Sequence, residues 1–391
     1  MEITDVETHL VGRDVGHAVD RWLYVSIRTD EGITGIGESG AWGFLPASKA
    51  AIESVRDYLI GKDPLRRDHH YQYLYRNAHF RGAAVMGALS ALDIALWDIA
   101  GKYYDAPVYE LLGGACRDKA RVYVHAFGET TDELVEECVA AKDQGFTAVG
   151  HLSPLLDEPR STPYFETHAQ LVGGAAERVR RYREAVGDAV DLCIEIHRRL
   201  EPDQAIALGR AIEEYHPMFY EDPVRPDSFD AMAQVAGKVG IPIATGERIH
   251  TVQEFEMLLA RDAVQYVRPD IALAGGLTGA KKVAALAEAR HVGVVPHNPL
   301  SPVTTAASLQ LAASIPNFAI QEYPFRPGRG EAPGHELVNE TFDRDGGFLA
   351  IPDRPGIGVT LDEGAIADAE EAYVPPAFET RLHEDGSVVD Q

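Results

Sequence analysis

Six acidic or histidine residues recur along the sequence from residue 195 onward, each at the end of a short apolar segment. They are Glu195, Glu221, Glu247, Asp270, His297 and Glu322. Successive members lie 23 to 27 residues apart, and a helix-like stretch separates each pair. An imidazole, His197, follows two residues after Glu195, so both face one side of an extended segment. Carboxylates and imidazoles at one recurring phase have the chemistry to bind a metal ion and to transfer protons.

The elements that must position these residues follow from the same spacing. Strands alternating with helices at this period predict parallel βαβ units, and eight such units close into a (β/α)8 barrel. The active site of that fold is built from residues at the carboxyl ends of the strands. One strand-end acid is commonly only a helix cap, but a series of them in phase predicts a shared pocket. The period extends backward to expected strands at Val122–His125 and Phe146–His151.

Three glutamates on successive strands make a suitable nest for a hard divalent cation. Mg2+ prefers oxygen ligands and retains open positions for water or substrate, so we expect one Mg2+ per subunit. Cysteine and histidine are not in phase with the glutamates as ligands, which argues against zinc.

Two histidines are expected to face each other across this cation site. His197 comes from the strand of the first glutamate, and His297 comes from the opposite side of the barrel mouth. Asp270, on the strand next to His297, would fix its tautomer and raise its basicity. This layout suits abstraction of a proton by one group and protonation of a leaving group by the other.

The rest of the chain predicts a second, smaller domain. Residues 1–115 read as an α+β domain, with strands near the N-terminus and an apolar, buried helix at Ala83–Gly101. Residues 116–322 form the barrel, and Leu152–Thr167 is a long insertion after its second strand. Residues 323–391 contain short strands at Gly347–Pro352 and Gly356–Leu361 and are expected to return to the N-terminal domain, which caps the barrel.

The composition limits the possible partners and the compartment. With 36 basic and 61 acidic residues, the net charge of −25 excludes non-specific binding to nucleic acid or anionic membranes. Acids dispersed over a lysine-poor surface suggest a halophilic protein in a salt-rich cytoplasm. Cys116, Cys138 and Cys193 are expected to be small buried residues in a reducing compartment. We expect a cytoplasmic protein, because no apolar run approaches a membrane span and the N-terminus resembles no leader.

Four sequence motifs resemble those of the enolase superfamily, and specifically its mandelate racemase subgroup. Gly87–Gly114 is similar to the signature at the end of the family's capping domain, and Phe219–Glu247 resembles its second signature. Pro296–Leu300 looks like the histidine motif of strand seven, and Ile320–Glu322 looks like the glutamate motif of strand eight. The resemblance covers essentially the whole chain and is strongest to the sugar-acid dehydratases.

The resemblance implies a role for each strand-end residue. The implied ligands of Mg2+ are Glu195, Glu221 and Glu247. The Asp270–His297 pair would take the C2 proton of a sugar acid, and His197 would protonate the departing C3 hydroxyl. Glu322 would hydrogen-bond the substrate carboxylate as it becomes an enediolate, which the metal stabilises. The implied product is a 2-keto-3-deoxy acid.

The sequence departs from the family pattern in two places. Glu195 stands where the family more often has aspartate, so the metal position is expected to shift. On strand two, Ala148–His151 contains no lysine, whereas racemases and cycloisomerases carry a Lys-x-Lys motif there. The missing lysines disfavour racemisation and lactonisation.

Residues outside the strand ends are candidates for substrate contact. They are Trp42, Arg81, Arg160 and Tyr164. Three other histidines are expected to pack or form hydrogen bonds rather than to act in catalysis: His125, His151 and His250.

Together these features predict a hydro-lyase that dehydrates an aldonic acid of the gluconate, galactonate or xylonate type, with a small-molecule sugar acid as its partner. We also expect a homo-oligomer. The alternatives are a sugar-acid epimerase or racemase of the same superfamily, and a weakly active paralogue that binds sugar acids.

Overall fold

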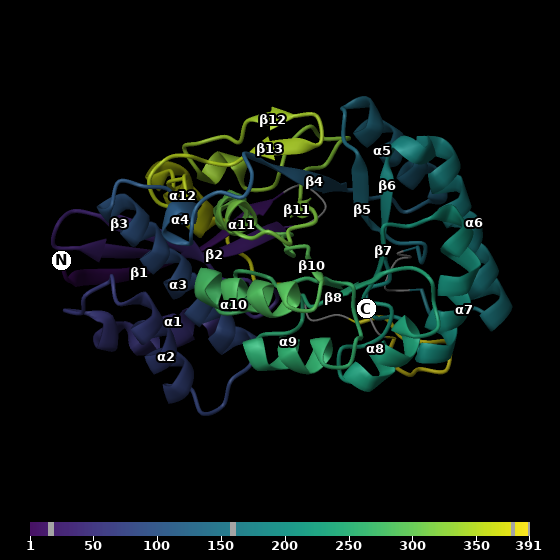
Figure 1. Ribbon diagram of the computed structural model, residues 1–391, viewed down its shortest axis with the longest axis horizontal. Helices are drawn as coiled ribbons and strands as arrows, with labels where there is room; N and C mark the ends of the chain where they lie inside the picture. The colour runs from purple at the N-terminus through teal and green to yellow at the C-terminus, as the bar shows by residue number, and fades with distance from the viewer. Residues whose placement is uncertain (15–18, 157–161, 377–379, 390–391) are drawn as a thin grey trace.

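The computed structural model describes residues 1–14, 19–156, 162–376 and 380–389. Figure 1 shows the N-terminal elements, in purple and blue, on one side of the molecule and the barrel, in teal and green, on the other. In the described N-terminal region an antiparallel sheet of order β1–β2–β3 lies against helices. These elements are β1 (Ile3–Asp14), β2 (Val19–Thr29), β3 (Thr34–Glu38), α1 (Leu45–Leu59), α2 (Arg67–Asn77), α3 (Ala83–Tyr103) and α4 (Val108–Leu111).

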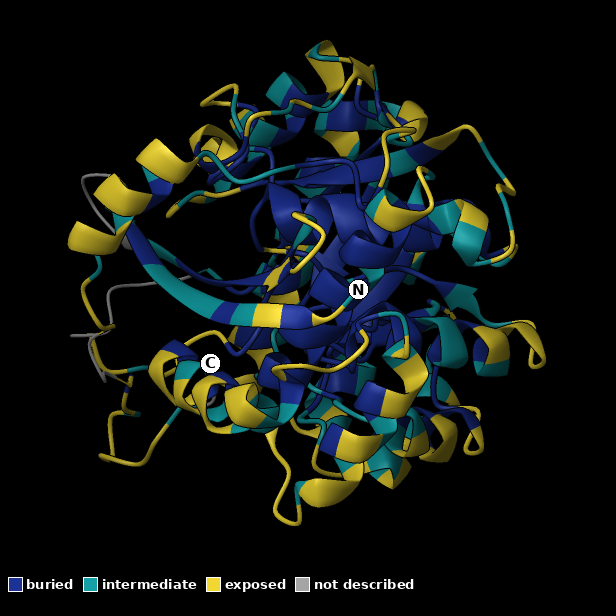
Figure 2. Ribbon diagram, turned by 90° about the vertical axis from the view of Figure 1, so that its left-hand side faces the viewer, coloured by how far each residue is buried: buried dark blue, intermediate teal, exposed yellow. Residues whose placement is uncertain are grey.

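The central helix α3 is packed so closely that two glycines of β3 are required. A Cβ atom at Gly35 would lie 2.2 Å from the Ala95 carbonyl oxygen, and one at Gly37 would lie 2.0 Å from that of Ala91. The sequence TGIGE therefore presents a bare backbone to the helix. Within the described residues, α3 is long and apolar enough to cross a membrane, but 78% of its most apolar window is buried inside the protein. Figure 2 shows this centre as a continuous buried region.

The barrel is closed by parallel strand pairing. Strands β4 to β10 pair in chain order, and β11 pairs with β4. A parallel bridge between Val294 and Phe318 closes the remaining gap between β10 and the start of β11. The barrel strands are β4 (Lys119–His125), β5 (Ala148–Leu152), β6 (Asp191–Glu195), β7 (Phe219–Glu221), β8 (Ile243–Thr245), β9 (Tyr266–Val267), β10 (Gly293–Val294) and β11 (Gln321–Tyr323).

The connecting helices carry regular start signals. Thr130, Thr167 and Thr251 are N-caps whose side chains accept hydrogen bonds from the third helical residue, in complete capping boxes. The helices are α5 (Thr131–Asp143), α6 (His168–Val186), α7 (Pro202–Ile212), α8 (Phe229–Ala236), α9 (Val252–Leu259), α10 (Gly276–Glu288) and α11 (Pro302–Ser314), with short 3-10 turns at Gly187–Ala189 and Glu213–Tyr215.

The barrel interior is filled by side chains of alternate strand positions. A buried cluster of its own consists of Tyr123, Ala148, Cys193, Phe219, Ala244, Val295 and Ile320. This filled interior holds the strand ends at fixed separations, as in other (β/α)8 barrels. The expectation that all three cysteines are buried is wrong for Cys116, which is exposed; Cys138 and Cys193 are buried. Cys116 lies in the linker before β4, where its backbone rather than its side chain makes the contact, by donating to Ala313.

The C-terminal segment contacts several parts of the molecule. Its elements are a 3-10 turn at His335–Leu337, β12 (Arg344–Asp345), β13 (Phe348–Ala350) and α12 (Glu363–Glu371). Helix α12 packs on β1 of the N-terminal domain (Figure 1), whereas β13 pairs antiparallel with β4 of the barrel. The strand expected at Gly356–Leu361 does not form in the described chain, because Gly356 and Gly358 adopt positive φ angles of 82° and 96°.

Candidate active site

Three glutamates converge at the carboxyl ends of β6, β7 and β8. Glu195 and Glu221 end adjacent parallel strands and are register partners. Glu247 follows β8 through Gly246, whose φ of 144° turns the chain inward. One carboxylate oxygen from each lies within 4.8 Å of the other two, and all three residues are buried. Three buried oxygen donors at this separation fit a hard divalent cation, which the family implies and for which the donor set is suitable.

Two imidazoles contact the first of these glutamates. His197 Nε2 lies 2.6 Å from one oxygen of Glu195, and His151 Nδ1 lies 2.9 Å from the other. The expectation that histidine does not share the positions of the glutamates is therefore wrong, because His151, Glu195 and His197 form a second group with metal-binding geometry. Nitrogen ligands widen the range of divalent metals that this side of the site accepts.

The contact between His197 and Glu195 depends on a turn rather than on strand alternation. β6 ends at Glu195, and His197 has a left-handed backbone with φ of 54°. His151 is also left-handed, with φ of 48°, at a point where the register between β5 and β6 shifts. Non-glycine residues in this conformation are uncommon and concentrate at functional sites. These local turns aim both imidazoles into the barrel mouth.

The charges of Glu195 and His197 are determined by the attraction between them. Burial alone would raise the pKa of Glu195, but the attraction of His197 and His151 outweighs it and holds this pKa well below its usual range. Burial lowers the pKa of His197, and the attraction of Glu195 reverses the shift, so that the pKa is raised. The attraction between the two residues therefore favours the anion of Glu195 and the protonated form of His197, which is the form that an acid must have.

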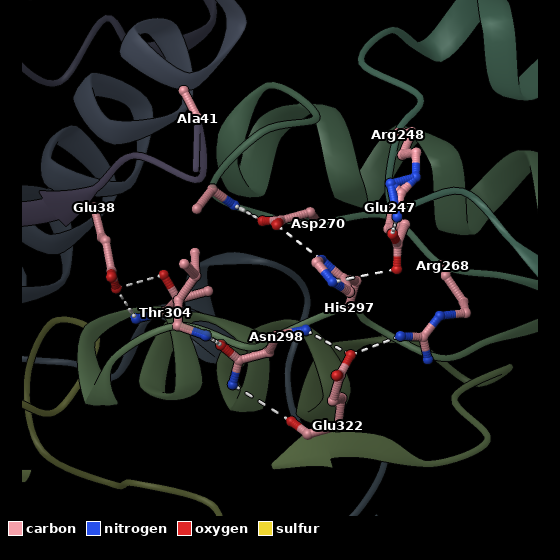
Figure 3. A network of polar contacts seen from close by, with 12 residues as sticks. Glu38, Ala41, Glu247, Arg248, Arg268, Asp270, His297, Asn298, Thr304 and Glu322 are labelled. Carbon is pink, nitrogen blue, oxygen red and sulfur yellow. Dashed lines mark hydrogen bonds and ion pairs between the residues drawn. The ribbon is translucent and has the colours of Figure 1, made fainter. Parts of the chain in front are cut away.

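The pair of Asp270 and His297 lies on the opposite side of the mouth. The two residues form a parallel bridge beyond β9 and β10, and His297 Nδ1 lies 2.9 Å from Asp270 Oδ2. Its other nitrogen, Nε2, faces Glu247 at 3.4 Å, as Figure 3 shows. Burial lowers the pKa of His297, but the attraction of Glu247, Glu322 and Asp270 raises it to about 9. Asp270 therefore orients the ring so that Nε2 points toward the glutamates.

Glu322, at the centre of β11, is held by three donors. Arg268 Nη2 lies 2.6 Å from its Oε2, and the backbone N–H of Asn298 donates to the same oxygen at 2.9 Å. His125 Nε2 lies 2.8 Å from Oε1. Burial alone would raise the pKa of Glu322, but the attraction of Arg268, His297 and His125 holds it well below its usual range. This carboxylate is therefore anionic and fixed in direction.

Two arginines compensate the negative charge of the cluster. Arg268 is fully buried, and its Nε lies 2.6 Å from Glu221 while Nη2 contacts Glu322. Arg248 Nη2 lies 2.6 Å from Glu247. Each glutamate of the cluster thus faces a basic side chain. Arg268 joins Glu221 to Glu322, and Figure 3 shows its contact with Glu322.

Some contributors to the site were not expected from the sequence. The sequence predicts that His125 and His151 pack or form hydrogen bonds, and they contact Glu322 and Glu195 respectively, as predicted. The spacing predicts no role for Arg268 or Arg248. The signal was present, since His125 ends β4 at the phase of the other strand-end residues. Arg268 lies two residues before Asp270 and so faces the same side of an extended segment.

The substrate-contact candidates are distributed more widely. Trp42 is 74% exposed, and Arg81 donates to the Tyr75 carbonyl at 3.1 Å and stacks on that ring. Tyr164 donates to Glu166 at 3.0 Å in the insertion after β5. Arg160 lies outside the described residues. The structure thus brings the strand-end residues together. A role of Trp42, Arg81, Arg160 and Tyr164 in substrate contact stays a prediction.

A small pocket opens beside the two imidazoles on Glu195. Its lining includes His151 and His197 together with Phe127, Leu134 and Leu155. The ring centroids of Phe127 and His151 are 4.6 Å apart.

This barrel with a capping domain and a strand-end cluster of carboxylates defines an enolase-type, metal-dependent enzyme, and the comparisons with known proteins agree. Residues 133–365 match the family model "Enolase C-terminal domain-like". Residues 15–113 match the N-terminal domain model of mandelate racemase and muconate lactonizing enzyme. The chain is 34% identical over 403 residues to a D-galactonate dehydratase of Xanthomonas oryzae pv. oryzae, and 35% identical over 400 residues to one of Variovorax paradoxus, with full coverage of both chains in each case.

Solved structures give the same result. An enolase of Agrobacterium radiobacter, proposed to be a galactarate dehydratase and solved with sodium and L-malate, superposes with a TM-score of 0.89 at 31% identity and full coverage of both chains. The 3,6-anhydro-D-galactonate cycloisomerase of Zobellia galactanivorans gives 0.83 at 28% identity, covering 94% of this chain and 99% of that one. The chain belongs to the mandelate racemase/muconate lactonizing enzyme family of the enolase superfamily. It is an enzyme of the hydro-lyase class, among the sugar-acid dehydratases.

Proposed function

We propose that the enzyme dehydrates an aldonic acid of the gluconate, galactonate or xylonate type to a 2-keto-3-deoxy acid, with Mg2+ as cofactor. The observation that carries this proposal is the placement of two imidazoles on opposite sides of one buried carboxylate cluster. His197 contacts Glu195, and His297 faces Glu247. An elimination needs a base at C2 and an acid at the C3 hydroxyl, and this arrangement supplies both.

The base in this proposal is His297. Its Nδ1 is engaged by Asp270, so Nε2 is the atom that receives the C2 proton. Glu247 and Glu322 stabilise the imidazolium that results and raise the pKa of His297 to about 9. The base is the neutral imidazole, which a cation bound to the glutamates would favour by lowering that pKa. Asp270 keeps the ring in one orientation throughout, as an oriented base requires.

The acid is His197, and Glu322 binds the substrate. His197, protonated and held by Glu195, donates its proton to the departing C3 hydroxyl. Glu322 lies on the side of His297 and is held by Arg268 and Asn298. To hydrogen-bond the substrate carboxylate as it becomes an enediolate, Glu322 must donate, so it takes up a proton when the substrate anion binds.

The cation would be held by Glu195, Glu221 and Glu247. When bound, it supplies positive charge beside the substrate carboxylate, where negative charge develops. Mg2+ is favoured because three carboxylates are hard oxygen donors and leave positions for a substrate.

The substrate class draws support from the relatives. The two D-galactonate dehydratases cover the full chain at 34% and 35% identity, so galactonate is the first candidate. We place the enzyme in the cytoplasm as a homo-oligomer that acts on a free sugar acid. The opposed imidazoles also suit a two-base epimerisation at C2, which is the second candidate.

The test is a panel of aldonic and aldaric acids incubated with the enzyme and Mg2+ at high salt, with 2-keto-3-deoxy acid read as its semicarbazone. We expect one aldonic acid to be converted with Mg2+ and none with EDTA. A C2 epimer formed without any 2-keto-3-deoxy acid would show that the enzyme is an epimerase and not a dehydratase. Binding of a sugar acid without formation of either product would indicate a weakly active paralogue that binds sugar acids.

A further inference from the structure

A buried carboxylate of the capping domain binds the start of the barrel helix that follows His297. Glu38, the last residue of β3, has no exposed surface. Its Oε2 accepts from Ser301 Oγ at 2.6 Å, from Thr304 N at 3.1 Å and from Thr304 Oγ at 2.7 Å. Its Oε1 accepts from Ser301 N at 3.3 Å. Ser301 is the N-cap of α11, so Glu38 supplies a second cap from another domain (Figure 3).

Hydrogen bonds connect this cap to the Asp270–His297 pair through the short loop between His297 and α11. Asn298 follows His297 directly, and its side chain donates to Thr305 in the first turn of α11 at 2.8 Å. Its backbone N–H donates to Glu322 at 2.9 Å. The position of the α11 N-terminus therefore determines the positions of His297 and Glu322.

A second buried carboxylate of the capping domain does the same for the helix that follows Asp270. Asp93 of α3 accepts from Thr278 N at 2.9 Å in the first turn of α10. The N-cap of that helix is Gly275, which has no side chain to cap it. Ser90, one turn before Asp93, accepts from Gly275 N at 2.8 Å. The capping domain therefore supplies the side-chain acceptors that the N-cap Gly275 does not offer to the start of α10.

Between these two contacts, the capping domain touches the loop of Asp270 directly. Gly40 N donates to the Ala272 carbonyl at 2.7 Å, and Ala272 N donates to Asp270 Oδ1 at 2.8 Å. A Cβ atom at Gly40 would lie 3.1 Å from Asp270 Oδ2, so glycine permits this close approach. The chain from β3 to residue 40 therefore lies against the loop of Asp270 and against the start of the helix that follows His297.

We propose that Glu38 and Asp93 are positioning residues that set the geometry of the Asp270–His297 pair from the capping domain. This inference rests on the proposed function for the meaning of the pair, but the contacts are independent of any substrate. The capping domain then has a second task besides covering the barrel mouth, because it fixes the two loops that carry the base and its orienting partner. A shift of about 1 Å in such a group lowers the rate by about 100-fold.

A buried carboxylate on the same helix provides a matched control. Asp98 of α3 has no exposed surface and accepts from Ile36 N at 3.0 Å and from Ile357 N at 2.9 Å. Its other partner is Lys102 of the same helix, at 2.6 Å. The partners thus belong to β3, to the C-terminal segment and to α3 itself, and none lies in either loop of the pair. Asp98→Asn therefore reports the loss of a buried interdomain acceptor without the proposed positioning effect.

The first test is hydrogen–deuterium exchange of the full-length protein, which needs no substrate. Glu38→Gln should raise amide exchange in peptides 294–300 and 318–324, and Asp93→Asn should raise it in peptides 266–274, while Asp98→Asn should leave all three unchanged. Thr304→Val is a milder change at the other end of the Glu38 contact and should raise exchange in peptides 294–300 and 318–324 by a smaller amount. This variant replaces Glu38→Gln if Glu38→Gln does not fold. Exchange in these peptides that is unchanged, or that rises equally in Asp98→Asn, overturns the proposal.

The second test uses the sugar acid that the wild-type enzyme converts. Glu38→Gln and Asp93→Asn should each lower kcat by about 10- to 100-fold and change KM by less than about 3-fold, since the pair is displaced and the cation site is not. A loss confined to KM, or equal in Asp98→Asn, contradicts positioning. If the wild type converts no acid in the panel, the proposed function fails while the exchange result still decides the positioning role.

Discussion

At the scale of single residues, Arg268 is the basic side chain that joins two buried acids of the site. Its guanidinium is fully buried and joins Glu221 to Glu322, and its Nη1 donates to the Tyr123 hydroxyl at 2.5 Å. Burial lowers the pKa of Arg268, but the attraction of Glu221, Tyr123 and Glu322 raises it well above its usual value. The residue is therefore always charged. Removing it takes the basic partner from Glu221 and leaves Glu322 with His125 and the Asn298 N–H.

We expect Arg268→Met to lower the free energy of unfolding by about 3–5 kcal/mol, because breaking a buried ion pair leaves an unpaired charge. Arg268→Lys, which keeps the charge but not the planar fork, should cost less. Urea denaturation of the metal-free proteins measures both changes. Equal stability of wild type and Arg268→Met would show that the acids do not need this partner.

The cation site makes a second prediction at this scale. Mg2+ at about 100 times its Kd should stabilise the protein by about 2.7 kcal/mol, because it binds the folded state alone, and EDTA should remove that gain. Glu221→Gln should abolish the rise in Tm, and Glu256→Gln, an exposed acid paired with Arg290, should retain it. A Tm unaffected by Mg2+ in the wild type would contradict the assignment of the cluster.

The residues of the site were predictable to different degrees. The strand-end acids and His297 could be placed from spacing, because the strand period fixes their phase. His151 and His197 depend on left-handed turns at strand ends, which alternation along a strand does not describe. Arg268 does not follow from the strand-end pattern, because it lies two residues before the strand-end acid Asp270, where the barrel interior also carries charge.

At the scale of elements, the two interdomain caps predict a dependence of stability on pH. Burial raises the pKa of Glu38 from 4.5 and that of Asp93 from 3.8, each to about 7. The folded state therefore holds these protons more tightly than the unfolded chain. The resulting stability is fully present below the unfolded pKa values and is lost as the pH rises through about 7.

We expect the wild type to lose a few kcal/mol of stability between pH 5 and pH 8, since one pKa unit corresponds to about 1.4 kcal/mol. Glu38→Gln and Asp93→Asn should each flatten this slope, because the amide does not titrate. Thermal unfolding at constant ionic strength across this range measures the slopes. A slope in the variants as steep as in the wild type would assign the titration to other groups.

The elements themselves were largely predictable. Alternating apolar segments and helix starts gave the barrel strands, and the apolar run after residue 82 gave α3. The end of the chain was not predictable in this way. Residues 356–361 have the apolar pattern of a strand, but their glycines turn the backbone. The two caps could not be foreseen either, since the donors of α10 and α11 meet acids more than 180 residues away in sequence.

At the scale of the whole molecule, the net charge of −25 predicts a dependence on salt. Self-repulsion destabilises the compact state, and the Debye length falls from about 10 Å at 0.1 M to about 3 Å at 1 M. We expect Tm to rise by several degrees or more between 0.1 M and 2 M KCl. Sucrose, which is excluded from protein surfaces without screening charge, serves as the control. An equal rise in sucrose, or none in KCl, would count against a halophilic protein.

The central claim is that His297 removes the C2 proton and His197 completes the loss of the C3 hydroxyl. The most direct measurement compares deuterium exchange at C2 with dehydration, in D2O, for the sugar acid that the wild type converts. We predict that His297→Asn abolishes both, because no base remains, and that His197→Asn lowers dehydration by about 100-fold or more while C2 exchange persists. Full dehydration by both variants, or loss of exchange in His197→Asn alone, would contradict the account.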